Sequence, residues 1–318
     1  MAASVGGHRY SDPDVLSLIY SGSEPLDPRV EVIQRARDLN ERLRLFPPIS
    51  DPRKRIEILA SLAGVKVLPM SNSPAPAQNR EALLFRNAGG NTHAFYDPTL
   101  SEGRTNFSIA HEIVHTFFPN SLHGARFRSL HLDDSREATE LERLCHLGAS
   151  ELLMPEDEFL EERGTAFGLS DVPRLAERFG SSYEATVYRL ATTHQGLAVA
   201  GRLKYRFRKS EERQLQDEKQ KLLFTSSDLV AEIPNRKYRR QSLHSSAACR
   251  ASDLIPWNKS FAETSCVYRA VTTQDVARGI ESLPNRASES GSIECVQAPY
   301  QYPLSDLDFP DVLFLWWK

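Results

Sequence analysis

The sequence predicts an α+β protein divided into two domains. The chain has 318 residues, which is more than one hydrophobic core usually serves. Hydrophobic residues make up 40% of it and charged residues 25%, as in an ordinary globular protein. Helical spacing of apolar residues, with a few strand-like runs, extends to about residue 195, and short strand-like runs between polar loops follow.

This change of pattern divides the chain into three regions. Residues 1–24 are expected to form a flexible leader, residues 25–200 the first domain, and residues 201–318 a smaller domain, β-rich or α/β. The boundary between the domains is expected near residues 195–210. No motif establishes what the second domain does, so a sensory or regulatory role stays open.

Two helices and three strands are expected in the first part of the first domain. Helical spacing predicts a helix over residues 28–45. Pro52 suits the first position of a second helix, which ends near Gly64. Strands are predicted at residues 65–70, 82–85 and 93–96.

Helices dominate the rest of the first domain. They are predicted over residues 105–118, 135–153 and 175–190, the last with a break at Gly180. The second domain is expected to contain short strands at residues 197–207, 222–225, 265–271, 291–296 and 312–316.

Charge, hydropathy and cysteine usage argue against several classes of protein. A net charge of −3 argues against a chain coated for binding nucleic acid or anionic membrane. No apolar run approaches the roughly 20 residues of a membrane span, and the N-terminal residues lack the pattern of a secretory signal. The four cysteines form no CxxC pair and are expected to be free thiols. We therefore expect a cytoplasmic protein that does not bind membranes.

The clearest chemical signal is the pentapeptide His111-Glu112-Ile-Val-His115. Residues four apart lie on one face of a helix, so the two imidazoles can point at one metal ion. Glu112 lies to one side of them, close enough to act on a water molecule held by that ion. The alternative is an ordinary packed helix with two hydrogen-bonded core histidines and an exposed glutamate.

The helix predicted over residues 135–153 offers a third ligand, because catalytic zinc sites commonly have three protein ligands and a water molecule. Glu142 and Glu137 fall on the two shoulders of its apolar stripe, where either can face inward. Glu140 and Glu151 fall on the opposite side. The helical pattern alone leaves Glu142 and Glu137 open, with Glu142 preferred.

A basic stretch at residues 202–209 alternates cationic and apolar side chains. It fits a nucleic-acid patch with interleaved aromatic residues or a half-buried strand with a solvated basic face. We favour the strand. Residues 235–240, also basic, are expected to form an exposed loop.

Three segments of the first domain resemble signatures that occur together in one family. Residues 107–115, FSIAHEIVH, resemble a stretch FTIAHELGH. Residues 142–155, ERLCHLGASELLMP, resemble the signature E-x-x-C/A-N/D-x-F-A-x-E-L-L-M-P. Residues 179–190, FGSSYEATVYRL, resemble a helix pair F-x-V-S-x-x-A-x-x-x-R-L. The family is that of the ImmA/IrrE metallopeptidases, and the resemblance covers about residues 50–195.

The resemblance implies a gluzincin-like zinc peptidase domain, with a small sheet packed against the helices that bear the metal site. It implies a single Zn²⁺ per chain, with His111, His115 and Glu142 as its ligands. The sequence departs from the family at two positions. His146 stands where Asn or Asp is usual, a position suited to orienting a ligand imidazole. Gly148 stands where Phe is frequent, which indicates altered local packing.

The implied chemistry is metal-assisted amide hydrolysis, with Glu112 as the general base that passes a proton to the leaving amine. A further group is expected to stabilise the oxyanion. The sequence does not choose among the candidates for that role, which are His123, His131, Tyr96 and Tyr188.

Members of this family typically cleave or otherwise inactivate helix-turn-helix repressors of the XRE type, which de-represses stress, prophage or mobile-element genes. By resemblance, we expect a zinc endopeptidase whose substrate is such a repressor, supplied as a separate protein. One alternative is a regulatory zinc-binding protein that inactivates the repressor by contact, without cleavage. Another is a DNA-binding regulator that uses residues 202–240. The complete ligand set with Glu112 argues against the first alternative, and the net negative charge argues against the second.

Overall fold

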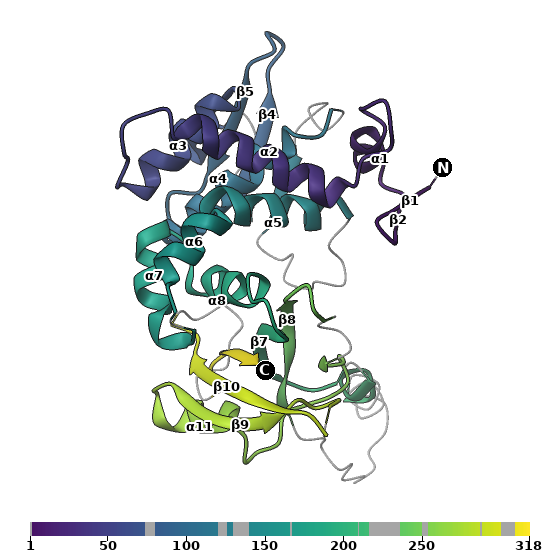
Figure 1. The fold of residues 1–318 in the computed structure, drawn as a ribbon, viewed down its shortest axis with the longest axis vertical. Helices are drawn as coiled ribbons and strands as arrows, with labels where there is room; N and C mark the ends of the chain where they lie inside the picture. The colour runs from purple at the N-terminus through teal and green to yellow at the C-terminus, as the bar shows by residue number, and fades with distance from the viewer. Residues whose placement is uncertain are drawn as a thin grey trace, which may run out of the picture. The chain divides into compact units, whose positions relative to one another are not determined.

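The structure is a computed structural model with mixed helices and sheets (Figure 1). It describes residues 2–73, 80–119, 126–129, 140–165, 167–208, 210–215, 236–249, 254–286, 288–299 and 309–318. The chain divides into two compact units. Unit 1 comprises Met1–Ala166 and Asp171–Arg189, and unit 2 comprises Phe167–Ser170 and Leu190–Lys318. None of the helices in the described part is long and apolar enough to cross a membrane.

Residues 3–19 form secondary structure in unit 1, within the stretch 1–24 that was expected to be a flexible leader. A hairpin of β1 (Ala3–Val5) and β2 (His8–Tyr10) is followed by α1 (Pro13–Ile19). Leu18 of α1 is fully buried. The backbone N–H groups of Ser11 and Asp12 donate to the Glu140 carboxylate at 2.7 and 2.9 Å, which ties this segment to the start of α5.

Two Asp-Pro pairs begin the next two helices, α2 (Pro28–Leu43) and α3 (Pro52–Leu62). The side chain of Asp51 accepts from the backbone N–H of Arg53 at 2.9 Å, which satisfies a donor that the helix leaves unpaired. Proline at the first helical position has no N–H to lose and already has a helical φ.

The sheet of unit 1 has the strand order β3-β5-β4-β6 within the described residues. Its strands are β3 (Val65–Pro69), β4 (Arg80–Arg86), β5 (Thr92–Tyr96) and β6 (Arg126–Ser129). β3 runs parallel to β5, whereas β4 is antiparallel to both β5 and β6. The sequence indicated the first three strands but not β6.

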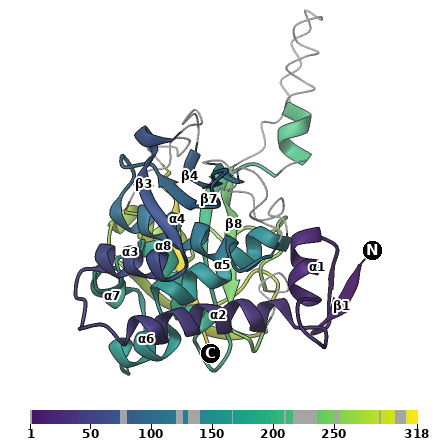
Figure 2. The same cartoon turned by 90° about the horizontal axis from the view of Figure 1, so that it is seen from above.

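Helix α4 (Glu102–His115) packs against α3, α5 and the strands β4 and β5. Helix α5 (Glu140–Leu153) packs against both α4 and α2, and Figure 2 shows α2 running alongside it. The rest of unit 1 contains α6 (Glu156–Arg163), α7 (Val172–Phe179) and the first part of α8 (Tyr183–Thr192). Gly180, where the sequence predicted a break, ends α7 in the left-handed conformation with φ of 56°.

Gly148 lets α5 approach α2 and α4 closely. A Cβ at this position would lie 2.7 Å from a γ carbon of Val32 and 2.8 Å from both γ carbons of Val114. The departure from the family's frequent Phe therefore has a structural reason, because the two valines fill the space that a side chain would need.

We expect Gly148→Ala to lower the free energy of unfolding by about 1–3 kcal/mol, because the helices must move apart. Helix propensity alone predicts the opposite sign, a gain of roughly 0.8–1 kcal/mol. Urea unfolding distinguishes the two. Ser150→Ala on the same helix is the control, and a stabilised Gly148→Ala variant would show that the contact is not tight.

Unit 2 contains a sheet with the order β8-β7-β11-β10-β9 in the described residues, and each neighbouring pair is antiparallel. Its strands are β7 (Ala198–Arg206), β8 (Lys237–Ser245), β9 (Ala277–Ser282), β10 (Ser290–Gln297) and β11 (Val312–Trp317). The helix α11 (Cys266–Thr273) packs on β9, β10 and β11. Trp316 is fully buried in the core of this unit.

Three elements expected in unit 2 are not found as predicted among the described residues. The strand predicted at residues 265–271 is wrong, because all of them except the capping Ser265 lie in α11, whose buried Cys266, Val267 and Ala270 have helical spacing. The strand expected at 222–225 lies outside the described residues. Most of residues 235–240, expected as an exposed loop, belong to β8, where Tyr238 is fully buried.

Candidate metal centre

Helix α4 places His111 and His115 one turn apart in the interior of unit 1. Their exposed fractions are 0% and 3%, and that of Glu112 is 1%. The helix is buried on almost every side over residues 108–115, since α3, α5 and the sheet all pack against it. Imidazole and carboxylate groups buried in this way need polar partners or a metal ion.

Helix α5 brings the carboxylate of Glu142 to both imidazoles. Its Oε2 lies 3.0 Å from Nε2 of His111, and its Oε1 lies 3.6 Å from Nε2 of His115. The Glu142 side chain is 18% exposed, so it is the most accessible member of the trio. The structure thus gathers the three residues that the motifs assign as ligands.

Two further donors lie beside them. Sγ of Cys145 is 3.5 Å from Nδ1 of His115. The ring of His146 lies 4.9 Å from that of His111 and 5.7 Å from that of Phe107, measured between centroids. His111, His115 and Cys145 form one compact set of donor atoms, and His111, Glu142 and His146 form another. The sequence did not indicate Cys145 as a donor near the metal. It falls on the apolar stripe of its helix, where a cysteine usually acts as a small hydrophobic residue.

The arrangement fits a divalent metal. Donor atoms of a tetrahedral zinc site with ligand bonds near 2.0–2.2 Å are separated by about 3.3–3.6 Å. The distances of 3.0 and 3.6 Å between Glu142 and the two Nε2 atoms are close to that value. Cys145 faces the other nitrogen of His115, Nδ1, where a partner fixes the orientation of a ligand ring.

Tyr96 and Tyr188, two of the candidates for oxyanion stabilisation, each contact a different neighbour. Tyr96, half-buried on β5, carries the guanidinium of Arg53 4.3 Å above its ring. The hydroxyl of Tyr188 donates to Glu184 on the same helix. His123, His131 and the alternative ligand Glu137 lie outside the described residues.

A buried carboxylate that the sequence did not single out lies next to the N-terminal half of α4. Glu81 of β4 is 3% exposed and accepts from Arg104 Nε at 2.9 Å and from Ser108 Oγ at 3.3 Å. Ser108 precedes Glu112 by one helical turn. Glu81 therefore fixes the rotation and height of α4 against the sheet. Glu81 lies in a short strand-like run, and nothing in that run indicated this role.

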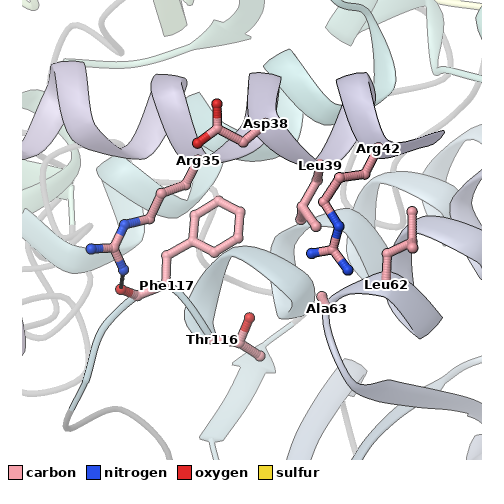
Figure 3. Close-up of a pocket in the computed structure, with 8 residues that line it drawn as sticks. All are labelled: Arg35, Asp38, Leu39, Arg42, Leu62, Ala63, Thr116 and Phe117. Atoms are coloured by element: carbon pink, nitrogen blue, oxygen red, sulfur yellow. Dashed lines mark hydrogen bonds between the residues drawn. The ribbon is translucent and has the colours of Figure 1, made fainter. Parts of the chain in front are cut away.

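A surface groove of about 310 Å³ lies near the other end of α4 (Figure 3). It is lined by Arg35, Asp38, Leu39, Arg42, Leu62, Ala63, Thr116 and Phe117. Arg35 spans its edge, donating to the Phe117 carbonyl at 2.6 Å and to Glu31 at 2.6 Å. This groove contains none of the candidate ligands, and Arg35 gives it a structural use in satisfying a carbonyl just beyond the C-terminal end of α4.

Comparison with known proteins assigns the region that holds this site. Residues 70–191 match the family model of Peptidase M78, described as the IrrE N-terminal-like domain. This region belongs to the ImmA/IrrE family of metallopeptidases. All three motifs that resembled the family, at residues 107–115, 142–155 and 179–190, fall inside the matched region, so the resemblance is confirmed.

The IrrE-like region is part of a longer structural likeness. A solved structure described as a Mycobacterium tuberculosis transcriptional regulator matches with a TM-score of 0.50 at 13% sequence identity. The match covers 92% of this chain and 80% of that one. At this identity the likeness concerns the fold alone. No curated protein matches the chain.

Proposed function

We propose that the chain is a zinc-dependent endopeptidase. The observation that carries the proposal is the approach of Glu142 on α5 to the Nε2 atoms of both His111 and His115 on α4. Helix α4 also carries Glu112. Two imidazoles and a carboxylate form a ligand set typical of catalytic zinc, which keeps a fourth position for water or substrate. The family assignment supports the same chemistry.

Each residue then has a defined task. His111, His115 and Glu142 would hold one zinc ion, which when bound would act as a Lewis acid and lower the pKa of water. Glu112 accepts a proton from the attacking water and delivers it to the amide nitrogen that leaves. Because Glu112 is 1% exposed, bulk water competes little for its carboxylate. Cys145 orients the ring of His115 through Nδ1.

The proposed fold of unit 1 is gluzincin-like. The helix with the His-Glu-His sequence, α4, packs on a small sheet, and a second helix, α5, supplies the carboxylate ligand. His146, which takes the place of the family's usual Asn or Asp, lies beside His111, where it can help to orient that ring.

The proposed substrate is a helix-turn-helix repressor of the XRE type, cut in the cytoplasm so that stress or mobile-element genes are de-repressed. The three family motifs support this choice. The structural neighbour described as a transcriptional regulator favours a role in gene control. The same description is compatible with one competing function, in which the protein releases a repressor by contact without cleaving it.

We expect purified protein to hold about one zinc ion per chain, and His111→Ala or His115→Ala to reduce this sharply. Glu142→Gln should weaken zinc retention far more than Glu137→Gln, the matched change on the residue that helical spacing left as the alternative. Cys145→Ser should retain the metal, because its role here is to orient a ligand. Elemental analysis after dialysis measures each value.

Two results would contradict this site. Full zinc occupancy in the His111→Ala/His115→Ala double variant would place the metal elsewhere. Loss of zinc from Cys145→Ser but not from Glu142→Gln would make the thiol the third ligand, and the site would then resemble a structural one.

A further inference from the structure

The strands β7 and β8 of unit 2 carry their cationic side chains on one face. Leu203 of β7 and Tyr238 of β8 belong to the hydrophobic core of the unit, and the partly buried Tyr205 of β7 packs against it. Side chains alternate between the two faces of a strand, so the residues between them project from the other face. Those residues are Arg202, Lys204 and Arg206 on β7 and Lys237 and Arg239 on β8, and we call them the basic face.

The register of the strands sets like charges against each other. Lys204 pairs with Arg239, and Arg206 pairs with Lys237, two positions further along. Residues directly opposite on antiparallel strands have Cβ atoms about 4.5–5.5 Å apart, and like charges at such positions are destabilising. Two successive pairs of this kind on one face are a cost to the free protein.

Acidic residues offset this charge only in part. At one end, Arg202 lies 3.7 Å from Asp311, and both side chains are buried. Glu211 is 3.8 Å from Arg239. Lys237 lies 3.7 Å from Glu263, whose side chain is 70% exposed.

Lys204 stands apart from these pairs. Within the part of the chain that the structure describes, its ammonium group has no hydrogen bond or ion pair. It lies half-exposed on the same face as the buried Arg239, directly across the ladder. The middle of the basic face is therefore a place where positive charge exceeds negative charge.

Arg239 adds a buried guanidinium with an unused donor to the same face. Its side chain is 2% exposed, and its Nε has no hydrogen-bond acceptor among the described residues. One terminal nitrogen donates to the Asn258 carbonyl at 3.2 Å. Burial, opposed by Glu211 but reinforced by Arg208 and Arg206, lowers the pKa of this guanidinium. A buried cation with an unused donor is stabilised by an anion with several acceptor oxygens.

We propose that the basic face of β7 and β8 binds a compact small molecule bearing adjacent phosphate groups, with Lys204 and Arg239 as its central contacts. Phosphate oxygens suit the guanidinium fork, and two or more negative charges match the surplus. The two rungs span only about 7 Å along the strands and 5 Å across them, which fits a diphosphate rather than an extended polymer. The net charge of −3 also opposes binding of a nucleic acid.

The test uses the full chain with inorganic pyrophosphate as the probe. Pyrophosphate should raise the midpoint of thermal unfolding of unit 2, and sodium chloride at equal ionic strength should not. Lys204→Glu removes the surplus and places a carboxylate opposite Arg239. In the absence of ligand, this variant should be at least as stable as the unmutated protein. Its affinity for pyrophosphate should fall by about tenfold or more, as expected for loss of a charge-assisted contact.

Arg286→Glu is the matched control, because it makes the same change of charge at the turn between β9 and β10, on the opposite edge of the sheet. It should respond to pyrophosphate like the unmutated protein. Chelation of a metal by pyrophosphate would affect all three proteins alike, so only the difference at Lys204 counts. Lys204→Gln serves as a second variant with the same expected loss of affinity.

Several results would overturn the proposal. One is an equal pyrophosphate response in Lys204→Glu and in the unmutated protein, and another is no response at low salt. A Lys204→Glu protein less stable than the unmutated one, with Lys204→Gln behaving likewise, would refute the like-charge argument. Tighter binding of single-stranded or duplex DNA than of pyrophosphate, lost in Lys204→Glu, would identify a nucleic-acid face in place of the small-molecule site.

Discussion

Replacing Glu112 with glutamine is expected to slow peptide cleavage by about 10²–10⁴-fold while the fold and the zinc content are retained. Glutamine has the size and polarity of glutamate but cannot accept the proton of the attacking water. Glu112 is 1% exposed on a helix packed on almost every side, so an isosteric change leaves the packing intact. The ligand set His111, His115 and Glu142 is complete without it.

The measurement is incubation of the protein and zinc with the cognate repressor, with intact masses of the fragments as the readout. Glu102→Gln is the matched control, because it makes the same change on the same helix at an exposed position far from the ligands. It should cleave at the normal rate. If Glu112→Gln de-repressed target genes as fully as the unmutated protein, with the repressor uncut, contact release would replace proteolysis as the mechanism.

The largest effect on stability is expected at Glu151. Its side chain is 3% exposed and lies 2.5 Å from Arg189, which is 6% exposed, and 3.0 Å from Arg37. Glu151→Gln should cost about 3–5 kcal/mol of unfolding free energy, because it leaves the charge of a buried arginine without its carboxylate. Arg189 belongs to α8 and Glu151 to α5, so the pair joins α5 to the part of α8 that lies in unit 1.

Urea unfolding followed by circular dichroism measures this loss in the transition of unit 1. Glu57→Gln is the matched control, since the side chain of Glu57 is 48% exposed and its i,i+4 pair with Arg53 is worth less than about 1 kcal/mol. The double variant Glu151→Leu/Arg189→Met should recover most of the stability, because it removes both charges together. Equal losses in Glu151→Gln and Glu57→Gln would show that the pair is well hydrated.

The sequence predicted those features that depend on neighbours along the chain. Asp51-Pro52 begins a helix because both the cap and the proline act within one turn, and His111 and His115 share a face because helical geometry alone requires it. The choice of Glu142 over Glu137 came from the family motif, since helical spacing left both possible. Its approach to both imidazoles depends on how α5 packs against α4, which no local pattern encodes.

The features that the sequence did not predict share one physical cause, which is that contacts between residues distant in sequence decide burial. Glu151 was assigned to the side of its helix away from the core, yet arginines from α2 and α8 surround it. Residues 265–271 form a short apolar run whose length fits either a strand or a helical turn, and packing against three strands selects the helix. Ser11 and Asp12 likewise bond to Glu140, 129 and 128 positions away, a contact that no local pattern encodes.

The path of the chain limits how the two units can be separated. Residues 167–170 belong to unit 2, although helices of unit 1 precede and follow them. The backbone of Leu169 donates to Glu294 at 2.5 Å, and the ring of Phe167 lies 5.2 Å from that of Trp317. A truncation near residue 200 would leave these residues without the sheet that they contact. Neither unit is one continuous stretch of the chain, so a cut at any single position divides at least one of them.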